Sequence, residues 1–313
     1  MGTDVMPKKT PFPLHMVSPL ISSTSLSQLC GREVLLKLDN TQPSGSFKIR
    51  GIGHFIGKNL ENGYDHIITS SGGNAGMAAA YASRRFGVPA TVVIPESTPQ
   101  LMISRLKEQD ANVIIAHITA NLGGITAKNI QIMEGHSTIV TEIMEQCPEK
   151  PAAIVVSVGG GGLLCGIFKG LHKHNAADIP VVAMETKGAH ALNAALQAGK
   201  PVSIGDITSI AKTLGALCVT QGVFDLKQGI QLLSNVISDK QAVEACEKFA
   251  DEHRILVEPA CGAALAAGYC GIIKDLILQG VIHKDGPIIF VVCGGNIVTL
   301  ELLMAWKNQF HVH

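Results

Sequence analysis

The chain has 313 residues, of which 46% are hydrophobic and 16% charged, a composition that excludes intrinsic disorder and favours a globular α/β protein of two lobes. Its 25 basic and 25 acidic residues balance, so charge gives no reason to expect a nucleic acid or a membrane as a partner. The eight cysteines occur singly and no apolar secretory signal opens the chain, so we expect reduced thiols and a cytoplasmic protein.

The first functional pattern is a strand, a turn and a helix that begins close to a lysine. Residues 34–40 form a short apolar-rich strand pattern, and Pro43 and Gly45 provide the turn. Helical spacing starts at Ile49, so Lys48 is predicted in the first turn, where the helix dipole disfavours an additional proton. If it is also buried, this lysine is suited to act as a Schiff-base nucleophile. Most lysines only face water, so the prediction depends on patterns further along the chain.

The second pattern is Ser70-Ser71-Gly72-Gly73-Asn74-Ala75-Gly76, which joins a strand (residues 66–69) to a helix of small residues (77–86). Its hydroxyl and N–H groups are suited to a carboxylate, and the Asn74 amide is suited to a ring hydroxyl. By itself, the pattern is equally typical of an ordinary capped loop between a strand and a helix.

Four consecutive glycines, Gly159-Gly160-Gly161-Gly162, form the third pattern. They follow a β-branched run (residues 153–156) that predicts a buried parallel strand, and they precede apolar residues at helical spacing. Successive backbone N–H groups at a helix start form an anion nest, which predicts phosphate binding. A flexible loop or a close helix–sheet contact is the alternative, although packing gives little reason for the backbone entropy that four glycines lose.

A dinucleotide-binding unit is a competing interpretation of the same region, because a strand (residues 181–184) and Glu185 follow the glycines. The G-x-G-x-x-G pattern fails in detail, since its last position is Leu164 when counted from Gly159 and Cys165 when counted from Gly160. A nicotinamide-dependent oxidoreductase would also leave Lys48 unexplained, and it is the weaker hypothesis.

Two further elements are predicted towards the C-terminus. A helix from Pro259 to Ile273 is the longest apolar one, and it is too short to span a bilayer. Cys293 ends a strand (residues 287–292), at the carboxyl edge where open α/β sheets bind ligands. A cysteine in an apolar strand is more often a small buried hydrophobe, so Cys293 predicts little by itself.

Together these patterns resemble the serine dehydratase family of fold-type II pyridoxal-phosphate (PLP) enzymes, and most closely its serine dehydratase-like branch, which has a glycine at the position of Gly72. The resemblance covers nearly the whole chain and includes residues 183–190 and 257–267. It implies a tryptophan synthase β-like α/β fold of two open lobes. Residues 1–40 and 134–313 would form the large PLP-holding lobe, and residues 41–133 the small lobe that closes on the substrate. It also implies a homodimer that acts in amino-acid metabolism and gluconeogenesis.

The resemblance assigns roles to individual residues. Lys48 would bind the PLP aldehyde and move the α-proton of the substrate, Phe47 would pack on the ring, and Cys293 would face the ring nitrogen. Gly159, Gly160, Gly161 and Gly162 would bind the phosphate, and Asn74 the ring hydroxyl. The substrate carboxylate would be held by Ser71, Gly72, Asn74 and Ala75. A monovalent cation such as K+ would be held by Glu185 with main-chain oxygens of Gly159, Ala189, Leu214 and Ala216.

The implied reaction is β-elimination from L-serine or L-threonine, which gives pyruvate or 2-oxobutanoate and ammonia. PLP is the electron sink, and the protein orients and tunes its ring. A neutral thiol opposite the ring nitrogen does not hold that nitrogen protonated, which favours prompt loss of a β-leaving group. This chain has Gly72 in place of a bulkier residue. We therefore expect the loop that holds the substrate carboxylate to be looser and the activity to be modest.

One departure from the family concerns residues 114–133. Family members normally have a helix, a strand and a Pro-Phe-Asp loop here, and this sequence has no counterpart of that loop. Two interpretations stay open. Either the shorter connection suffices, or the chain is a PLP-binding homologue with weak or no turnover.

Overall fold

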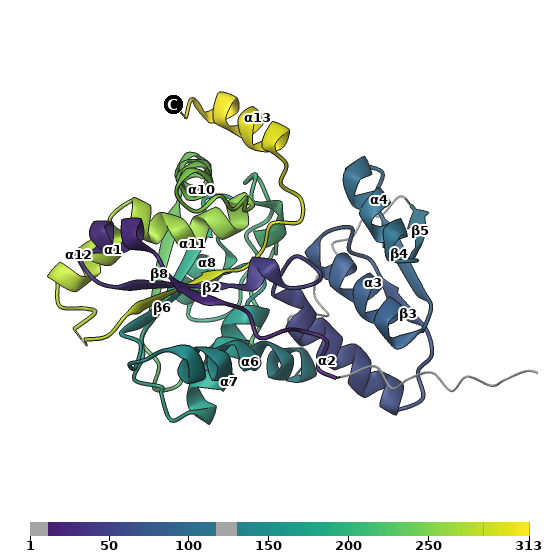
Figure 1. Ribbon diagram of the computed structural model, residues 1–313, viewed down its shortest axis with the longest axis horizontal. Coiled ribbons are helices and arrows are strands. Elements are labelled where there is room, and N and C mark those ends of the chain that lie inside the picture. Colours follow the sequence, from purple (N-terminus) through teal and green to yellow (C-terminus); the bar gives the residue numbers. More distant parts are fainter. Residues whose placement is uncertain (1–11, 117–129, 284, 313) are drawn as a thin grey trace, which may run out of the picture.

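The computed structural model describes residues 12–116, 130–283 and 285–312. These residues contain two sheets (Figure 1), and the α/β fold class predicted from the sequence is confirmed. The shortened connection predicted between residues 114 and 133 lies largely outside the described residues. In spatial order, the larger sheet of the described chain has the strands β1 (Leu20–Ser22), β2 (Val34–Leu38), β9 (Ile288–Val292), β6 (Ala153–Ser157), β7 (Val181–Thr186) and β8 (Leu232–Ile237).

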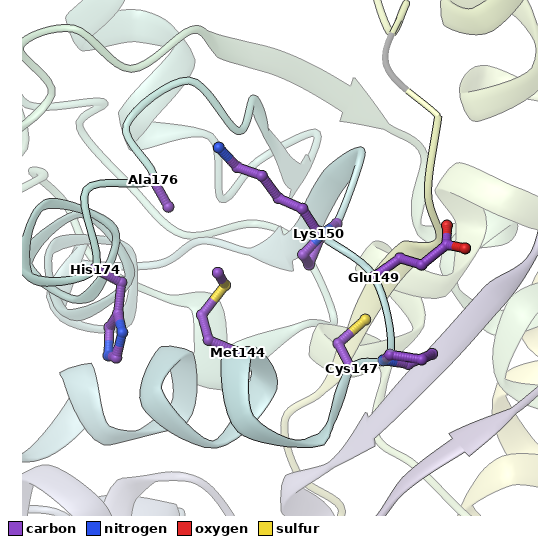
Figure 2. A pocket seen from close by; sticks show the side chains of 8 residues that line it. Met144, Cys147, Glu149, Lys150, His174 and Ala176 are labelled. Carbon is purple, nitrogen blue, oxygen red and sulfur yellow. The ribbon is translucent and has the colours of Figure 1, made fainter.

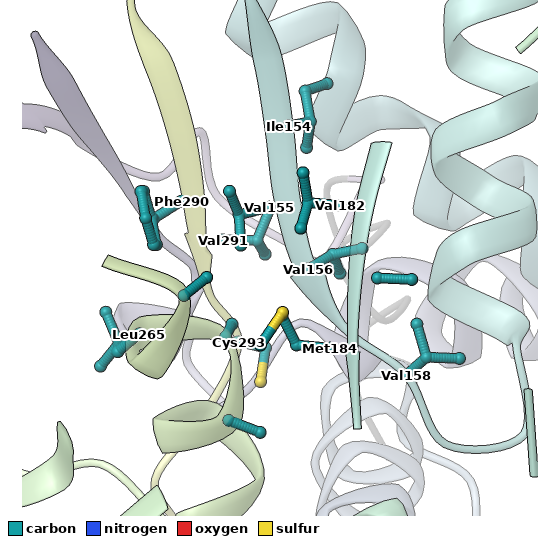
Figure 3. Close-up of a cluster of buried hydrophobic side chains, with 14 of the residues drawn as sticks. Ile154, Val155, Val156, Val158, Val182, Met184, Leu265, Phe290, Val291 and Cys293 are labelled. Carbon is teal, nitrogen blue, oxygen red and sulfur yellow. The ribbon is translucent and has the colours of Figure 1, made fainter. Parts of the chain in front are cut away.

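The central strands of this sheet are parallel and buried on both faces, which explains their continuous apolar sequences. Val155 pairs with Val182 on one side and with Phe290 on the other. Figure 3 shows their side chains packed together with Met184 and Cys293. The edge strand β1 is antiparallel to β2. Because parallel strands end at the same edge, Ser157 and Cys293 come to lie at one end of the sheet.

Helices cover both faces of the larger sheet (Figure 1). Below it in that view are α6 (Ile130–Gln146) and α7 (Gly162–Lys173), and above it are α10 (Asp239–His253) and α11 (Pro259–Tyr269). Small residues let α6 and α7 approach closely, since a Cβ added at Gly166 would lie 2.4 Å from the Cβ of His136. The remaining helices of this part are α1 (Thr24–Cys30), α8 (Ala191–Ala198), α9 (Gly222–Leu226), α12 (Ile272–Leu278) and α13 (Leu300–Phe310), with single 3-10 turns at Asp39–Thr41 and Lys212–Leu214.

The prediction of one long apolar helix from Pro259 to Ile273 is wrong, because the structure has two helices there. Gly271 adopts a left-handed conformation (φ +80°) and separates α11 from α12. Among the described residues, the stretch Pro259–Leu278 is long and apolar enough to cross a membrane by length and composition. Its α11 part is buried from Pro259 to Gly268, and this position in the core accounts for its apolar composition.

The smaller sheet consists of β3 (Ile67–Thr69), β4 (Ala90–Ile94) and β5 (Asn112–Ile115), all parallel, with α3 (Asn74–Phe86) and α4 (Gln100–Glu108) packed beside it (Figure 1). Helix α2 (Lys48–Glu61) lies between the two sheets. One face of α2 packs on α3, and Gly135 lets α6 approach the other face. The start of α2 therefore lies where the two parts of the molecule meet.

A buried ion cluster fixes the first turn of α2. Arg50 donates to Asp39 at 2.6 Å and to Glu142 on α6 at 2.5 Å, and Lys37 lies 2.6 Å from the second oxygen of Glu142. All four side chains are buried. Removing one partner of such a cluster leaves a buried charge uncompensated, which typically costs about 3–5 kcal/mol. The cluster thus fixes the position of the helix that begins with Lys48.

Candidate active site

Lys48 is the first residue of α2, as the strand–turn–helix pattern predicted. The turn before it is joined to the turn that follows β9. The Phe47 N–H donates to the Cys293 carbonyl at 3.0 Å, and Ser46 forms an isolated bridge with Gly294. Two segments from opposite ends of the chain thus meet at Lys48.

The Lys48 amine lies in an environment that favours its neutral form. Its side chain is half-buried, and Nζ lies 4.8 Å from the centroid of the Phe47 ring. Burial lowers the pKa of the Lys48 amine below its ordinary range, while Cys293 and Glu258 act in the opposite direction. A lysine with a lowered pKa is available as a nucleophile or base at neutral pH.

Cys293 is buried at the carboxyl end of the larger sheet, among the side chains of β6, β7 and β9 (Figure 3). Its Sγ lies 3.4 Å from Oγ of Ser157, which ends the neighbouring strand β6. The thiol thus lies beside the end of β6, while the carbonyl of the same residue bonds the turn that carries Lys48.

The four glycines connect β6 to α7, and α7 begins at Gly162. Gly161 has a φ of +88°, a conformation that residues with a side chain rarely adopt. The Gly160 carbonyl accepts a hydrogen bond from the N–H of Thr220 at 3.0 Å, which fixes the loop. The first N–H groups of a helix have no partner within the helix, so the fixed loop presents donors suited to a phosphate.

Asn74 is the first residue of α3 and is buried. Its Nδ2 donates to Oε1 of Glu258 at 2.7 Å, and Thr213 Oγ1 donates to the same oxygen at 2.8 Å. A Cβ added at Gly294 would lie 3.6 Å from Asn74 Nδ2 and 2.9 Å from the Ser46 Cβ. Asn74 is thus close to the turn that carries Lys48.

The loop predicted to hold the substrate carboxylate is tightly packed at Gly72. A Cβ added there would lie 2.8 Å from Cγ2 of Thr98 and 3.1 Å from Cγ2 of Ile94. Ser71 is half-buried and accepts a hydrogen bond from the N–H of Gly73 at 3.4 Å. The space beside Gly72 is therefore filled by neighbouring side chains, which does not agree with the expectation of a looser loop.

The sequence patterns gave no role to His136, whose ring packs against the ring of Phe47. The two ring centroids lie 5.0 Å apart with an interplanar angle of 54°, and His136 is buried. Burial, followed by the charges of Lys48 and Arg50, lowers the pKa of His136 to about 3. A neutral imidazole thus fixes the ring next to Lys48. No local sequence pattern indicates this contact, because α6 and the turn are distant along the chain.

Four buried polar atoms of this region have no hydrogen-bond partner among the described residues: Ser46 Oγ, Asn74 Oδ1, His136 Nδ1 and Glu258 Oε2. Buried polar atoms are normally paired, so several unpaired ones close together are typical of a site that can bind a polar ligand. Together with the lysine, the thiol and the phosphate-type loop, these atoms fit PLP. The resemblance assigned no role to Glu258, and its neighbour Thr213 was also missed.

Part of the predicted cation ligand set is close together. The Gly159 position approaches the Leu214 carbonyl, since an added Cβ would lie 2.9 Å from that oxygen. Glu185 is buried, and its carboxylate accepts the N–H groups of Leu192 and Asn193, both at 2.8 Å. Burial raises the pKa of Glu185 to about 7. Ala189 pairs with Thr186 in a turn next to Glu185.

A cavity of about 410 Å³ lies elsewhere, at the opposite end of β6 (Figure 2). Its one amine, that of Lys150, is already paired with Asp178 at 2.7 Å. The cavity contains none of the predicted site residues. Its lining consists of Met144, Cys147, Pro148, Glu149, Lys150, Pro151, His174 and Ala176.

Comparison with known proteins agrees with this site. Residues 12–294 match the family described as "Pyridoxal-phosphate dependent enzyme", and the chain belongs to this family. The resemblance noted in the sequence is confirmed at this level, and the nicotinamide oxidoreductase hypothesis is not supported.

Named relatives cover almost the whole chain. It is 49% identical to the L-serine dehydratase/L-threonine deaminase of Homo sapiens, over 95% of this chain and 96% of that protein. It is 43% identical to the serine dehydratase-like protein of Homo sapiens, over 95% of both. Among solved structures, a fungal L-serine ammonia-lyase from Rhizomucor miehei superposes with a TM-score of 0.87 at 30% identity, over 95% of this chain and 99% of that one.

Proposed function

We propose that the chain is a PLP-dependent L-serine/L-threonine ammonia-lyase, which converts serine to pyruvate and threonine to 2-oxobutanoate with release of ammonia. The observation that carries this proposal is the junction of Lys48 and Cys293, joined by the hydrogen bond from the Phe47 N–H to the Cys293 carbonyl. The names of the similar proteins from Homo sapiens and Rhizomucor miehei support the same substrates and reaction.

Each group of the site has a task in this reaction. When bound, PLP supplies an electron sink for the electron pair left at the α-carbon. Lys48 would hold the aldehyde and then accept the α-proton at Nζ, for which its lowered pKa prepares it. The β-hydroxyl and a proton leave as water, and water later replaces the amino group as ammonia. No net oxidation occurs, so no redox partner is needed.

The other residues bind and orient. The loop from Gly159 to Gly162 would hold the phosphate, Phe47 would pack on the ring and Asn74 would bond the ring hydroxyl. The Cys293 thiol would face the ring nitrogen. Backbone and hydroxyl groups would hold the substrate carboxylate, and they come from Ser71, Gly72, Asn74 and Ala75.

A monovalent cation near the phosphate loop is part of the proposal. It is supported by the Leu214 carbonyl beside Gly159 and by the buried Glu185 carboxylate, since hard cations prefer oxygen ligands of these kinds. We extend the proposal to a cytoplasmic homodimer that does not bind membranes and acts in amino-acid metabolism and gluconeogenesis. The balanced charge and the unpaired cysteine pattern support the location, and molar mass in solution tests the dimer.

The decisive experiment couples serine turnover to a pyruvate-reducing indicator enzyme, with protein that has been loaded with PLP. We expect pyruvate from L-serine and, at a lower rate, 2-oxobutanoate from L-threonine. The visible absorption of bound PLP is recorded on the same sample. A folded sample that shows this band but forms no pyruvate would be a PLP-binding homologue without turnover, and the ammonia-lyase proposal would be abandoned.

A further inference from the structure

Glu258 is a buried acidic residue in the middle of the proposed site, without a role in the function described so far. It lies at the residue before α11 and is 2% exposed. One oxygen of its carboxyl group, Oε1, accepts the hydrogen bonds from Asn74 and Thr213. The other oxygen, Oε2, is buried without a partner among the described residues.

These two hydrogen bonds join separate parts of the molecule. Asn74 begins α3, directly after the loop that follows β3 in the smaller sheet. Thr213 lies in the 3-10 turn whose next residue, Leu214, contacts Gly159 of the phosphate-type loop. Glu258 itself directly precedes α11 in the larger part. A single carboxyl group thus connects the asparagine to the side of the site where the phosphate-type loop lies.

The hydrogen bond to Glu258 also determines which atoms of the Asn74 amide remain available to bind a ligand. One N–H of its amide is used by Glu258, so the second N–H and the unpartnered Oδ1 remain. Nδ2 lies on the Lys48 side, near Gly294. Without Glu258, Nδ2 would lose this acceptor and the amide would be free to rotate.

We propose that Glu258 is a positioning residue of the active site: its carboxyl group fixes the orientation of the Asn74 amide towards the bound cofactor. The inference rests on the proposed function, since it assigns the ligand of Asn74 as the ring hydroxyl of PLP. Because Oε1 is the acceptor for both bonds, the positioning does not depend on whether Oε2 carries a proton.

The charge around Glu258 is consistent with this role. Burial raises the pKa of Glu258, while the hydrogen bonds from Thr213 and Asn74, the charge of Lys48 and the backbone of Ile297 lower it. Lys48 is the only charged side chain among these influences. The carboxyl group is therefore stabilised by the same residues that it would orient or face.

The test is a double-mutant cycle between the two residues, read out by PLP titration of the apoprotein and by the visible band of bound PLP. Loss of the hydrogen bond from Asn74 to the cofactor should weaken PLP binding about tenfold in Asn74→Ala, and loss of the orientation of Asn74 should weaken it similarly in Glu258→Ala. In the double variant, we expect binding no more than about twofold weaker than in Asn74→Ala, because Glu258 acts through Asn74. The band should shift in the same direction in both single variants.

Two further variants make the experiment interpretable. Glu258→Gln keeps an acceptor oxygen and should restore PLP binding to within about threefold of the original protein. Glu252→Ala is the matched control, because this carboxyl group accepts bonds from Ser25 and Tyr269 at the far end of α11. It should leave both the affinity and the band unchanged.

Defined results overturn the inference. Unchanged PLP affinity and an unchanged band in Glu258→Ala would do so, as would a double variant whose loss equals the product of the two single losses. Both readouts are obtained without substrate. A protein that binds PLP but forms no pyruvate would therefore contradict the proposed reaction and still report on Glu258.

Discussion

The Phe47 N–H donates a hydrogen bond to the Cys293 carbonyl at 3.0 Å, and this bond places the start of α2 on the end of β9. The lysine and the thiol thus come from two backbone segments that are fixed to each other. Their relative position does not depend on long side chains. Relative positions of this kind matter, because small displacements of a reacting group are costly in catalysis.

Lys48→Ala should abolish covalent attachment of PLP, because no other amine is predicted at the ring. After PLP loading and borohydride reduction, peptide mapping of the unchanged protein should find the pyridoxyl group on Lys48. Lys58→Ala, near the other end of the same helix and exposed to solvent, is the control and should label normally. Label on another lysine in the unchanged protein would refute the assignment.

Gly161→Ala should weaken PLP binding by about tenfold or more. Its φ of +88° costs an alanine about 1–2 kcal/mol, and the added Cβ would lie 2.8 Å from Val219 and Val223. Gly199→Ala is the matched control. It has a φ of +69° with no atom within 4 Å of the added Cβ, and it lies after α8. Gly199→Ala should lower the free energy of unfolding by a similar amount, because its backbone conformation is equally unfavourable for alanine, and it should leave PLP affinity unchanged. Equal PLP affinities in both variants would contradict the phosphate assignment.

Cys293→Asp should slow pyruvate formation and increase racemisation of serine. A carboxylate facing the ring nitrogen raises the pKa of that nitrogen by about 1–3 units, so the ring becomes protonated. Pyruvate and D-serine are measured on the same samples, with the exposed Cys270→Ser as control. If Cys293→Ser left both the cofactor spectrum and turnover untouched, Cys293 would not belong to the site.

His136→Gln should make stability less dependent on pH in acid. The pKa of His136 is lowered to about 3, below its ordinary value of 6.5. Between these values the unfolded chain binds a proton that the folded protein does not. The free energy of unfolding therefore falls as the pH decreases, by up to about 1.4 kcal/mol per pH unit for this group.

Denaturant unfolding between pH 7 and pH 4 checks this prediction. His15, whose pKa is lowered to about 4, acts in the same direction, so part of the slope should remain in His136→Gln. His311→Gln, at the exposed end of α13, controls for the loss of an imidazole as such. The same slope in His136→Gln as in the unchanged protein would contradict the assignment.

Glu185→Gln should remove the stabilisation by potassium that the proposed cation site predicts. In the unchanged protein, the midpoint of thermal unfolding should be higher in potassium chloride than in choline chloride of the same ionic strength. In Glu185→Gln, the two salts should give the same midpoint. A midpoint that does not differ between the salts in the unchanged protein would exclude a stabilising site for K+.

Local sequence patterns predicted those parts of the site that are formed within a single short segment of strand, turn and helix. The apolar runs before Ser157 and Cys293 are buried strands, and Lys48 and Gly162 are the first residues of helices. In both cases the period of the apolar residues changes at a glycine or proline turn, and this change is visible in the sequence.

The residues that were missed depend on contacts between distant segments. Glu258 and His136 lie in apolar or helical surroundings that give no local indication of a site, and their roles follow from Asn74 and Phe47 across the fold. The break between α11 and α12 was missed for a different reason. Gly271 lies within an apolar run, and its left-handed conformation is not distinguished from an ordinary helical glycine by the pattern alone.

The pairing of β2 with β9 has a consequence for synthesis on the ribosome. Lys48 leaves the ribosome well before the backbone that holds its turn, from β9 to Gly294, is made. Pairing between such distant segments is slow and cannot begin before the later segment is available. A nascent chain that ends before β9 should therefore be unable to retain the cofactor, even with Lys48, the carboxylate loop and the four glycines already translated.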